Sequence, residues 1–417
     1  MTIALDAETV QNEVSADTAA AKTAQATIDA AELTSKATAL RELIRANANQ
    51  TEADRKVTQP VIDALDEAGL FKLAQPRRLG GYELPIRDFV EITSIIAQGD
   101  ASAGWVATLT NVCAWIVGTF PDQAQRDVWG DDENARVCGV VAPTSTTEWA
   151  EGGLRVTGKW GFASGSLHAQ WAVLGIPVID ENGAQIDQGL ALIPLSDLSI
   201  EDTWYVAGMR GSGSNTLVAD DVFVPAHRIL SVSRGINGDY PTEHTEEALY
   251  RSAMVPVLAL VLAGPLVGAA QAALDLVLGS LAKGKGISYT FYERASDSGS
   301  TQINIAEAAI LVDSAYLHLY RAADAIDAAA AEGVYPSRLE RARSRMDTGY
   351  IARLTRQAVD LLLSVQGAGS FAEVSPLQRI WRDLNTGSRH AVINPSISAE
   401  AFGRELLGLS EQVTPLV

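Results

Sequence analysis

The sequence predicts a multidomain α+β protein in which a β-domain lies between two helical regions. The chain has 417 residues, which is too long for one ordinary hydrophobic core. Apolar residues recur with helical spacing before residue 135 and after residue 250. Between them, short β-branched runs are separated by Gly, Pro and Asp or Asn, as in a small barrel or sandwich.

The first helical region follows a segment, residues 1–35, that we expect to be flexible because it has no apolar face. Residues 36–135 form the N-terminal helical domain. Helices are predicted over 37–73, as two helices within 88–120 that meet near Gly99 and Asp100, and from Asp122 onward. Residues 77–85, RRLGGYELP, predict a turn-rich connection.

The β-domain is predicted over 136–230, with strands in VCGVVAP, LRVTGKWGFASG, WAVLGIPVI, GLALIPL and TLVADDVFVP. ENGAQ, residues 181–185, indicates a hairpin turn. Residues 231–249 are polar and turn-rich, which is typical of a loop or lid.

The second helical region, 250–417, predicts a bundle with helices over 254–283, 301–332, 336–366 and 376–392. Residues 252–274 carry no charge and are long enough to cross a bilayer. However, this stretch contains two prolines and many alanines and lacks a basic flank, which favours a buried core helix.

Composition excludes several function classes. The net charge of −19 disfavours nucleic acid and anionic membranes as partners. The only cysteines, Cys113 and Cys138, do not have CxxC spacing, so neither a disulfide framework nor a zinc site is indicated. The N-terminus has no basic region followed by an apolar run, so we expect a cytoplasmic protein.

Several residues could carry chemistry. The stretch WGFASG ends a predicted strand, where an aromatic ring and a serine can contact a flat ligand or simply pack in the core. MRGSGSNTLVADDVFVP is a Gly/Ser loop before a strand and lacks the context of a dinucleotide-binding motif. Trp105 is a core residue or covers a planar ligand, and His168 lines the same pocket or ends a strand.

The remaining histidines show neither metal-ligand spacing nor the order of a hydrolase triad. We expect His227 and His318 to be structural and His244 to be solvated. His390 is conspicuous because it lies in RDLNTGSRHAVINP, after an apolar helical pattern and before an Asn-Pro break.

Segments spread from about residue 60 to 395 resemble a known family. They are DASAGWVATL, FPDQAQRDVWGDD, GKWGFASGSLHAQW, WYVAGMRGSGSNTLVADDVFVPAHR, INIAEAA and PLQRIWRDLNTGSRHA. The order of helices, β-barrel and four-helix bundle resembles the acyl-CoA dehydrogenase fold. The segments themselves are similar to the oxygenase components of two-component flavin monooxygenases, among them secosteroid and 4-hydroxyphenylacetate hydroxylases.

The resemblance assigns a role to His390. By position, the catalytic glutamate of an acyl-CoA dehydrogenase falls at Ala391, so the base for α-proton abstraction is missing. In the hydroxylases, a histidine at the place of His390 contacts flavin and substrate. A neutral imidazole there can accept a phenol proton while a flavin C4a-hydroperoxide transfers oxygen.

Further roles are implied by the resemblance alone. Ser164 is expected to hydrogen-bond near flavin N5 and to protect the hydroperoxide. The other expected cofactor-binding residues are Trp105, Val141, Phe162, His390 and Ala391, with Ala368 and Gly369 supplied by a neighbouring subunit of a homotetramer. Cys113, where some aromatic hydroxylases have a second histidine, and His168 are expected in the substrate pocket. No phosphate-binding basic residue is clearly matched, although Lys285 or Arg294 could substitute, which leaves FMN and FAD open.

The predicted function is therefore the oxygenase component of a flavin-dependent monooxygenase. It uses reduced flavin (FMNH2 or FADH2) and O2 to hydroxylate an aromatic, phenolic or polycyclic, small molecule. A separate NAD(P)H:flavin reductase would supply the flavin, by diffusion. The alternatives are an N-oxygenase of an amino sugar or other amine, an acyl-CoA dehydrogenase, which Ala391 disfavours, and a catalytically inactive assembly protein.

Overall fold

A computed structural model describes residues 30–417, and most of the N-terminal segment predicted to be flexible lies outside them. Residues 30–35 are helical and belong to the first described helix. The N-terminal helices are α2 (Ala30–Asp54), α3 (Gln59–Glu67), α4 (Ile86–Gly99), α5 (Ala101–Gly118) and α6 (Asp122–Trp129). The helix predicted over 37–73 is broken after Asp54, where Arg55 has a φ of 54°, a backbone conformation that does not continue a right-handed helix.

The junction of α4 and α5 lies where the sequence predicts it, and Asp100 explains why. The Asp100 side chain accepts a hydrogen bond from the backbone N–H of Ala103 at 3.0 Å. This bond satisfies one of the amide groups that the first turn of α5 leaves unpaired. A new helix therefore begins at Ala101, at an angle set by the extended backbone of Asp100 (φ −156°).

Two four-stranded sheets form the β-domain. One has the order β1-β4-β5-β8 and the other β2-β3-β7-β6. Their bounds are β1 Val137–Val140, β2 Ser145–Ala150, β3 Gly153–Ala163, β4 Trp171–Ile179, β5 Gln185–Pro194, β6 Ser199–Glu201, β7 Asn215–Pro225 and β8 Ile229–Ser231. Side chains of both sheets share one hydrophobic cluster, so the domain is a small sandwich. The hairpin turn predicted at 181–185 joins β4 and β5.

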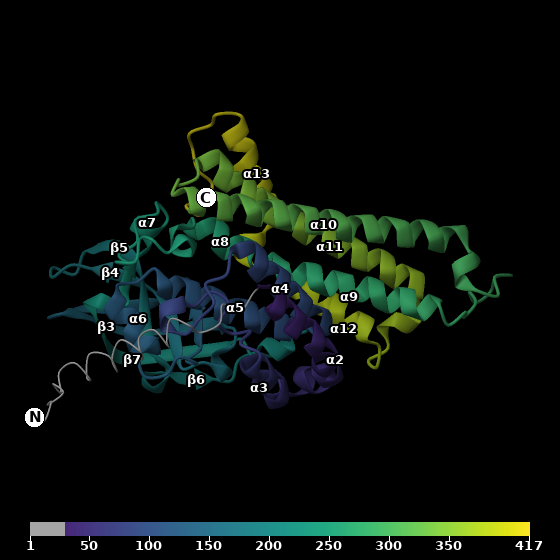
Figure 1. Cartoon of the computed structure of the whole chain (residues 1–417), viewed down its shortest axis with the longest axis horizontal. Helices are drawn as coiled ribbons and strands as arrows, with labels where there is room; N and C mark the ends of the chain where they lie inside the picture. The colour runs from purple at the N-terminus through teal and green to yellow at the C-terminus, as the bar shows by residue number, and fades with distance from the viewer. Residues whose placement is uncertain (1–29) are drawn as a thin grey trace, which may run out of the picture.

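The C-terminal helices are α8 (Met254–Leu260), α9 (Ala263–Leu281), α10 (Gly299–Glu332), α11 (Arg338–Gln366), α12 (Pro376–Gly387) and α13 (Pro395–Leu406). Figure 1 shows α9, α10 and α11 running together away from the β-domain. Two differences from prediction stand out. The helix predicted over 376–392 ends at Gly387, and the Asn394 side chain accepts hydrogen bonds from Ser396 N and Ile397 N to start an additional helix, α13.

Two helical stretches are apolar and long enough to cross a membrane, Ala101–Gly118 and Met254–Leu281. Within the fold, 94% and 83% of their apolar windows are buried. The prediction of a buried core segment at 252–274 is confirmed, although the segment is divided between α8 and α9. The α+β architecture of helices, sandwich and helical bundle is also confirmed.

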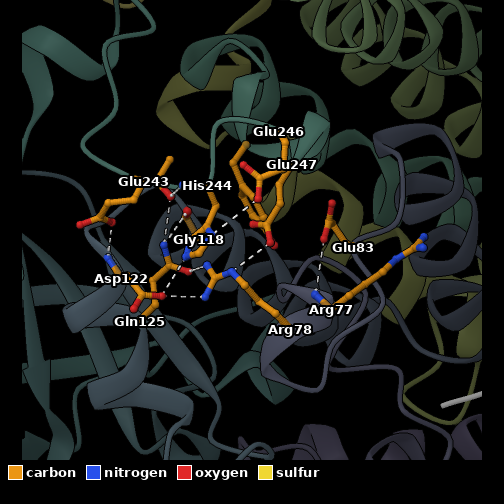
Figure 2. A network of polar contacts seen from close by, with 12 residues as sticks. Arg77, Arg78, Glu83, Gly118, Asp122, Gln125, Glu243, His244, Glu246 and Glu247 are labelled. Atoms are coloured by element: carbon orange, nitrogen blue, oxygen red, sulfur yellow. Dashed lines mark hydrogen bonds and ion pairs between the residues drawn. The ribbon is translucent and has the colours of Figure 1, made fainter. Parts of the chain in front are cut away.

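The segment predicted as a loop or lid, 231–249, contains the last residue of β8, the short helix α7 (Val232–Gly235) and the start of a 3-10 turn at Ala248–Arg251. Polar contacts fasten its second half to the N-terminal domain, as Figure 2 shows. Arg78 pairs with Glu247 at 2.9 Å and with Asp122 at 3.0 Å, and His244 bonds Asp122 at 2.9 Å. These contacts hold residues 243–247 of the segment against the N-terminal domain.

Candidate functional site

Trp105 and Ser164 join the N-terminal helices to the β-domain. The indole Nε1–H of Trp105, on α5, donates to Ser164 Oγ at 3.2 Å. Ser164 directly follows β3, and both side chains are buried, with exposed fractions of 6% and 5%. Two residues that the sequence singled out separately therefore belong to one hydrogen-bonded unit.

Ser164 is also the end of a chain of three serine hydroxyls. Ser164 Oγ lies 2.6 Å from Ser214 Oγ, and Ser214 Oγ lies 2.6 Å from Ser212 Oγ. Ser212 Oγ in turn donates to the backbone carbonyl of Met209 at 2.8 Å. All three serines are buried, so water does not compete for these bonds. The Gly/Ser loop before β7 is thus hydrogen-bonded to Ser164 through Ser214.

Met209 is held in a conformation that a side-chain-bearing residue rarely adopts, with a φ of 56°. Three bonds maintain it. The carboxylate of Asp383 accepts from Met209 N at 2.6 Å, and the Met209 carbonyl accepts from Trp204 Nε1 at 2.9 Å as well as from Ser212. Asp383 lies on α12, so this loop connects the β-domain to the bundle.

Phe162 presents its ring outward from the last residues of β3. Its φ is 67° and its side chain is 73% exposed. A register shift in the β3–β7 pairing between Trp160 and Ala163 explains this, because a β-bulge turns a side chain out of the regular alternation. The ring contacts Trp204 edge-on, with 5.6 Å between ring centroids. An exposed aromatic ring held in a strained backbone is typical of a ligand surface.

His390 approaches Trp105 from the bundle. Their ring centroids are 6.1 Å apart. The helix α12 ends at Gly387, which packs so closely that a Cβ would lie 2.8 Å from Met209 Cε and 3.4 Å from Trp105 Cζ3. His390 then takes extended backbone angles (φ −55°, ψ 140°) ahead of the turn Ala391–Ile393.

The imidazole of His390 is accessible to solvent in the single chain, yet dense protein surrounds it. Desolvation lowers the pKa of His390 to about 4. The ring is therefore neutral at pH 7 and has a nitrogen lone pair that can accept a proton.

Two buried carboxylates lie beneath the site. Asp100 and Asp383 are 6% and 4% exposed, and burial raises the pKa of each. The Asp100 carboxylate raises the pKa of Asp383 further, while Arg379 opposes both shifts. Asp383 therefore retains a proton more readily than an exposed aspartate, without losing its role as acceptor for Met209 N.

A cavity of about 530 Å³ lies next to α12 but does not coincide with the site. It is lined by Asn49, Glu52, Ala53, Arg210, Glu373, Gln378 and Arg382. Arg382 and Glu52 form an ion pair at 2.6 Å, so its charges are largely matched within the protein. None of the residues around Ser164 lines it, and we place the functional site by the residue geometry.

The remaining predicted site residues are distributed as follows. Cys113 is buried two turns beyond Trp105 on α5 and faces Gly139 of β1, where an added Cβ would lie 2.9 Å from its Sγ. Val141 follows the same strand. Burial raises the pKa of the Cys113 thiol well above its ordinary value, so it is uncharged, and it packs in the hydrophobic core.

His168 ends the 3-10 turn Ser166–His168 after Ser164. Within residues 30–417, no hydrogen bond reaches its buried Nε2. Desolvation, with the nearby charges of Lys56 and Arg136, lowers the pKa of His168 to about 4. No ring contact or hydrogen bond joins His168 to Trp105 or His390 in the described part of the chain.

Ala368 and Gly369 lie in an exposed turn, Ala368–Phe371, at the end of α11, and Ala391 is exposed beside His390. The single chain does not bring Ala368 or Gly369 into contact with Trp105 within residues 30–417. Their predicted contribution to a neighbouring subunit's site stays a prediction.

The other three histidines have partners. His227 bonds Asp127 at 2.8 Å and His318 bonds Asp347 at 2.9 Å, as expected for structural residues. The expectation that His244 is merely solvated is wrong, because it bonds Asp122. His244, Glu246 and Glu247 offer three ligand atoms within 4.8 Å of one another, but Arg78 already pairs with Glu247 (Figure 2), and we assign no metal to them.

Sequence reasoning missed the residues that support Ser164. They are Asp383, Trp204, Met209, Ser212 and Ser214. The Gly/Ser loop was noticed, but nothing in its spacing indicated that two of its serines meet the end of β3. The one available signal was the placement of small polar residues on both sides of Gly213, whose φ of 57° bends the loop back.

The fold and site define a class. Two family models match, the acyl-CoA dehydrogenase N-terminal domain over residues 31–131 and the acyl-CoA dehydrogenase C-terminal domain over 260–395. The expectation that the glutamate base of that class falls at Ala391 stays a prediction.

Similar proteins indicate which branch of this fold class the chain resembles. The HsaA oxygenase subunit of a flavin-dependent monooxygenase from Rhodococcus jostii is 36% identical over 89% of this chain and 97% of its own length. The oxygenase component of an FADH2-dependent resorcinol hydroxylase from a Rhizobium species is 34% identical over 88% of this chain and 92% of its own. The structure of XiaF from a Streptomyces species, in complex with FADH2 and glycerol, has a TM-score of 0.86 and 32% identity and covers 97% of this chain and 99% of its own.

The chain accordingly belongs to the oxygenase components of flavin-dependent monooxygenases, a branch with the acyl-CoA dehydrogenase fold. It is an oxidoreductase that uses reduced flavin, which a separate flavin reductase supplies.

The residues present fit a flavin. Phe162 offers an exposed aromatic face, Trp105 and His390 approach each other from two other units, and Ser164 Oγ is hydrogen-bonded to Trp105. A bound reduced flavin supplies the electrons that activate O2. The chain's own residues supply a stacking surface, a hydroxyl and a neutral imidazole.

Proposed function

We propose that this protein inserts one oxygen atom into the ring of a phenolic or other hydroxylated aromatic compound, with FADH2 as its flavin. The observation that carries the proposal is the neutral imidazole of His390 beside Trp105. A phenol becomes more electron-rich when its proton is accepted, and a base with its lone pair free at neutral pH can accept it.

The choice of substrate and flavin is supported by relatives above 30% identity. One is named as a resorcinol hydroxylase that depends on FADH2, and another structure contains FADH2. More distant relatives act on 4-hydroxyphenylacetate and on indole-3-acetate, so the aromatic ring is the shared element of these names.

Each site residue has a proposed task. Phe162, Trp105 and Val141 support the planar ring of the flavin, and Ser164 hydrogen-bonds at its N5. His390 accepts the substrate's proton. Cys113 and His168 remain proposals for the substrate pocket.

The assembly is also a proposal. Ala368 and Gly369, exposed at the end of α11, would contact the flavin of a neighbouring subunit in a homotetramer. Reduced flavin would reach the site by diffusion from the reductase, in the cytoplasm.

The function is tested by supplying reduced FAD and ¹⁸O2 with a panel of phenols, indoles, amino sugars and acyl-CoA thioesters. We expect one ¹⁸O atom to appear on the ring of a phenol, detected by mass spectrometry. Labelling of an amine nitrogen alone would replace the proposal with N-oxygenation. Oxidation of an acyl-CoA without oxygen incorporation would contradict both.

A further inference from the structure

The three buried serines impose a direction on the hydroxyl of Ser164. A serine hydroxyl has one proton and two lone pairs. Ser212 must use its proton on the Met209 carbonyl, because a carbonyl can only accept. In the 2.6 Å contact between Ser212 and Ser214, Ser214 is therefore the donor.

The same count settles the next contact. Since Ser214 has given its proton to Ser212, Ser164 must donate in the 2.6 Å contact between Ser164 and Ser214. Trp105 Nε1–H donates to Ser164 as well, and an indole N–H cannot accept. Ser164 is left with no free proton and with one free lone pair. Toward any further partner it can only accept.

A flavin presents opposite chemistry at N5 in its two redox states. In reduced flavin, N5 carries a hydrogen and can donate. In oxidised flavin, the same atom carries a lone pair and can only accept. A hydroxyl that can only accept forms a hydrogen bond with N5–H of reduced flavin. With N5 of oxidised flavin it forms none, because a lone pair of the oxygen then faces a lone pair of the nitrogen. Hydrogen bonds to ring nitrogens are one means by which a protein tunes its flavin.

We infer that Ser212 and Ser214, through the polarity they impose on Ser164, make the site selective for reduced over oxidised flavin. This inference rests on the proposed position of Ser164 at flavin N5. Ser212 and Ser214 act as positioning residues, since they fix the proton of Ser164 without contacting the flavin. Reversing the chain to favour oxidised flavin would break the bond from Ser212 to the Met209 carbonyl, which burial makes costly.

Met209 anchors the chain from the other end. Its carbonyl also accepts from Trp204 at 2.9 Å, and its N–H is fixed by Asp383 at 2.6 Å. The peptide that joins Met209 to Arg210 therefore cannot rotate to present the Arg210 N–H to Ser212 without losing the bond from Trp204. The direction of the three hydroxyl protons follows from the backbone of one residue.

The test measures dissociation constants of FAD and of dithionite-reduced FAD under anaerobic conditions, for the unmodified protein and for variants. Ser214→Ala removes the acceptor for the Ser164 proton, which can then turn to oxidised N5. We expect oxidised FAD to bind roughly tenfold tighter, the effect of about 1.4 kcal/mol from one neutral hydrogen bond. The affinity for reduced FAD should stay unchanged, because Ser164 keeps its lone pairs.

Matched variants separate polarity from packing. Ser164→Ala should weaken the binding of reduced FAD, again roughly tenfold, with little change in the binding of oxidised FAD. Ser214→Thr keeps a hydroxyl, so the ratio of the dissociation constants of oxidised and reduced FAD should equal that of the unmodified protein. The same is expected of Ser196→Ala, at an exposed serine. If Ser214→Ala fails to fold, Ser212→Ala should lower the ratio in the same way, since Ser214 can then donate back to Ser164.

An unchanged ratio in both Ser214→Ala and Ser212→Ala would overturn the inference, and so would an equal weakening of both redox forms. Those results would leave the proposed function standing if the unmodified protein binds reduced FAD and hydroxylates a phenol. Failure of the unmodified protein to bind reduced FAD would overturn the two together.

Discussion

The carboxylate of Asp383 accepts a hydrogen bond from the backbone N–H of Met209 at 2.6 Å, across 174 residues of sequence. This bond ties α12 to the Gly/Ser loop and holds Met209 at its positive φ. The site therefore depends on a buried acid that does not itself face the proposed ligand.

Replacement of Asp383 should separate hydrogen bonding from charge. Asp383→Ala leaves a buried N–H unpaired and should lower the free energy of unfolding by about 1–3 kcal/mol. Asp383→Asn keeps an oxygen acceptor. Because the folded pKa of Asp383 is raised, the folded state binds more protons than the unfolded chain, and stability is lost as pH rises above the unfolded value of about 3.9.

Asp383→Asn removes that loss, so its stability relative to the unmodified protein should increase with pH across this window. Urea denaturation at several pH values measures it. Asp131→Asn, at an exposed position, is the control. An Asp383→Asn protein as unstable as Asp383→Ala would show that the charge itself is needed.

Stability on the acid side should depend on His168. Its folded pKa of about 4 lies below the unfolded value of about 6.5. The unfolded chain therefore binds the extra proton, and stability should fall as the pH is lowered from about 6.5 to 4, by at most about 3 kcal/mol. His168→Phe cannot titrate and should reduce this slope. Equal slopes in the two proteins would mean that the buried ring is hydrated.

Loss of His390 should impair hydroxylation of neutral phenols more than flavin binding. His390→Ala should lower the rate by about 10²–10⁴-fold, while the dissociation constant of reduced FAD changes little. An unperturbed histidine has a pKa of about 6.5, but desolvation lowers the pKa of His390 to about 4. The unmodified rate should therefore be nearly constant above pH 5 and fall only as pH approaches 4.

A phenol of low pKa distinguishes proton acceptance from positioning. Such a substrate is already ionised at neutral pH and should recover much of the rate lost in His390→Ala. His227→Gln, at a histidine bonded to Asp127 outside the site, is the control. If the ionised phenol reacts no faster, His390 orients the substrate and is not its base.

Arg78 should determine how firmly residues 243–247 are held. Its side chain bonds Glu247 and Asp122 (Figure 2), and the Glu247 side chain is only 11% exposed. Arg78→Met leaves that carboxylate without its cation and should cost about 1–3 kcal/mol. Amide hydrogen exchange at residues 243–250 should be faster in Arg78→Met than in the unmodified protein.

Arg126→Met is the matched control, because Arg126 pairs with the same Asp122 from a side chain that is 67% exposed. Exposed ion pairs contribute little, so its cost should be below about 1 kcal/mol. Equal costs in the two variants would mean that Arg78 does not fasten the segment.

The periodicity of the sequence correctly indicated most elements. It located the junction at Asp100, the hairpin at 181–185 and the buried segment at 252–274, because local hydrogen bonding, turn chemistry and apolar patterning decide these features. It failed at Gly387, where a helical pattern continues but α12 ends. The close packing of Gly387 against Met209 and Trp105 could not be predicted either, because these residues are far apart in the sequence.

The sequence by itself determined the class of protein and showed that residue 391 is an alanine, since these depend on which residue types occur and in what order. Only the tertiary structure decided that one hydrogen-bonded line runs through Trp105, Ser164, Ser214, Ser212 and Met209. It also lowered the pKa of His390. The line contains bonds between residues 59 and 50 positions apart, and the lowered pKa of His390 depends on desolvation by the surrounding protein. Spacing along the sequence expresses neither of them.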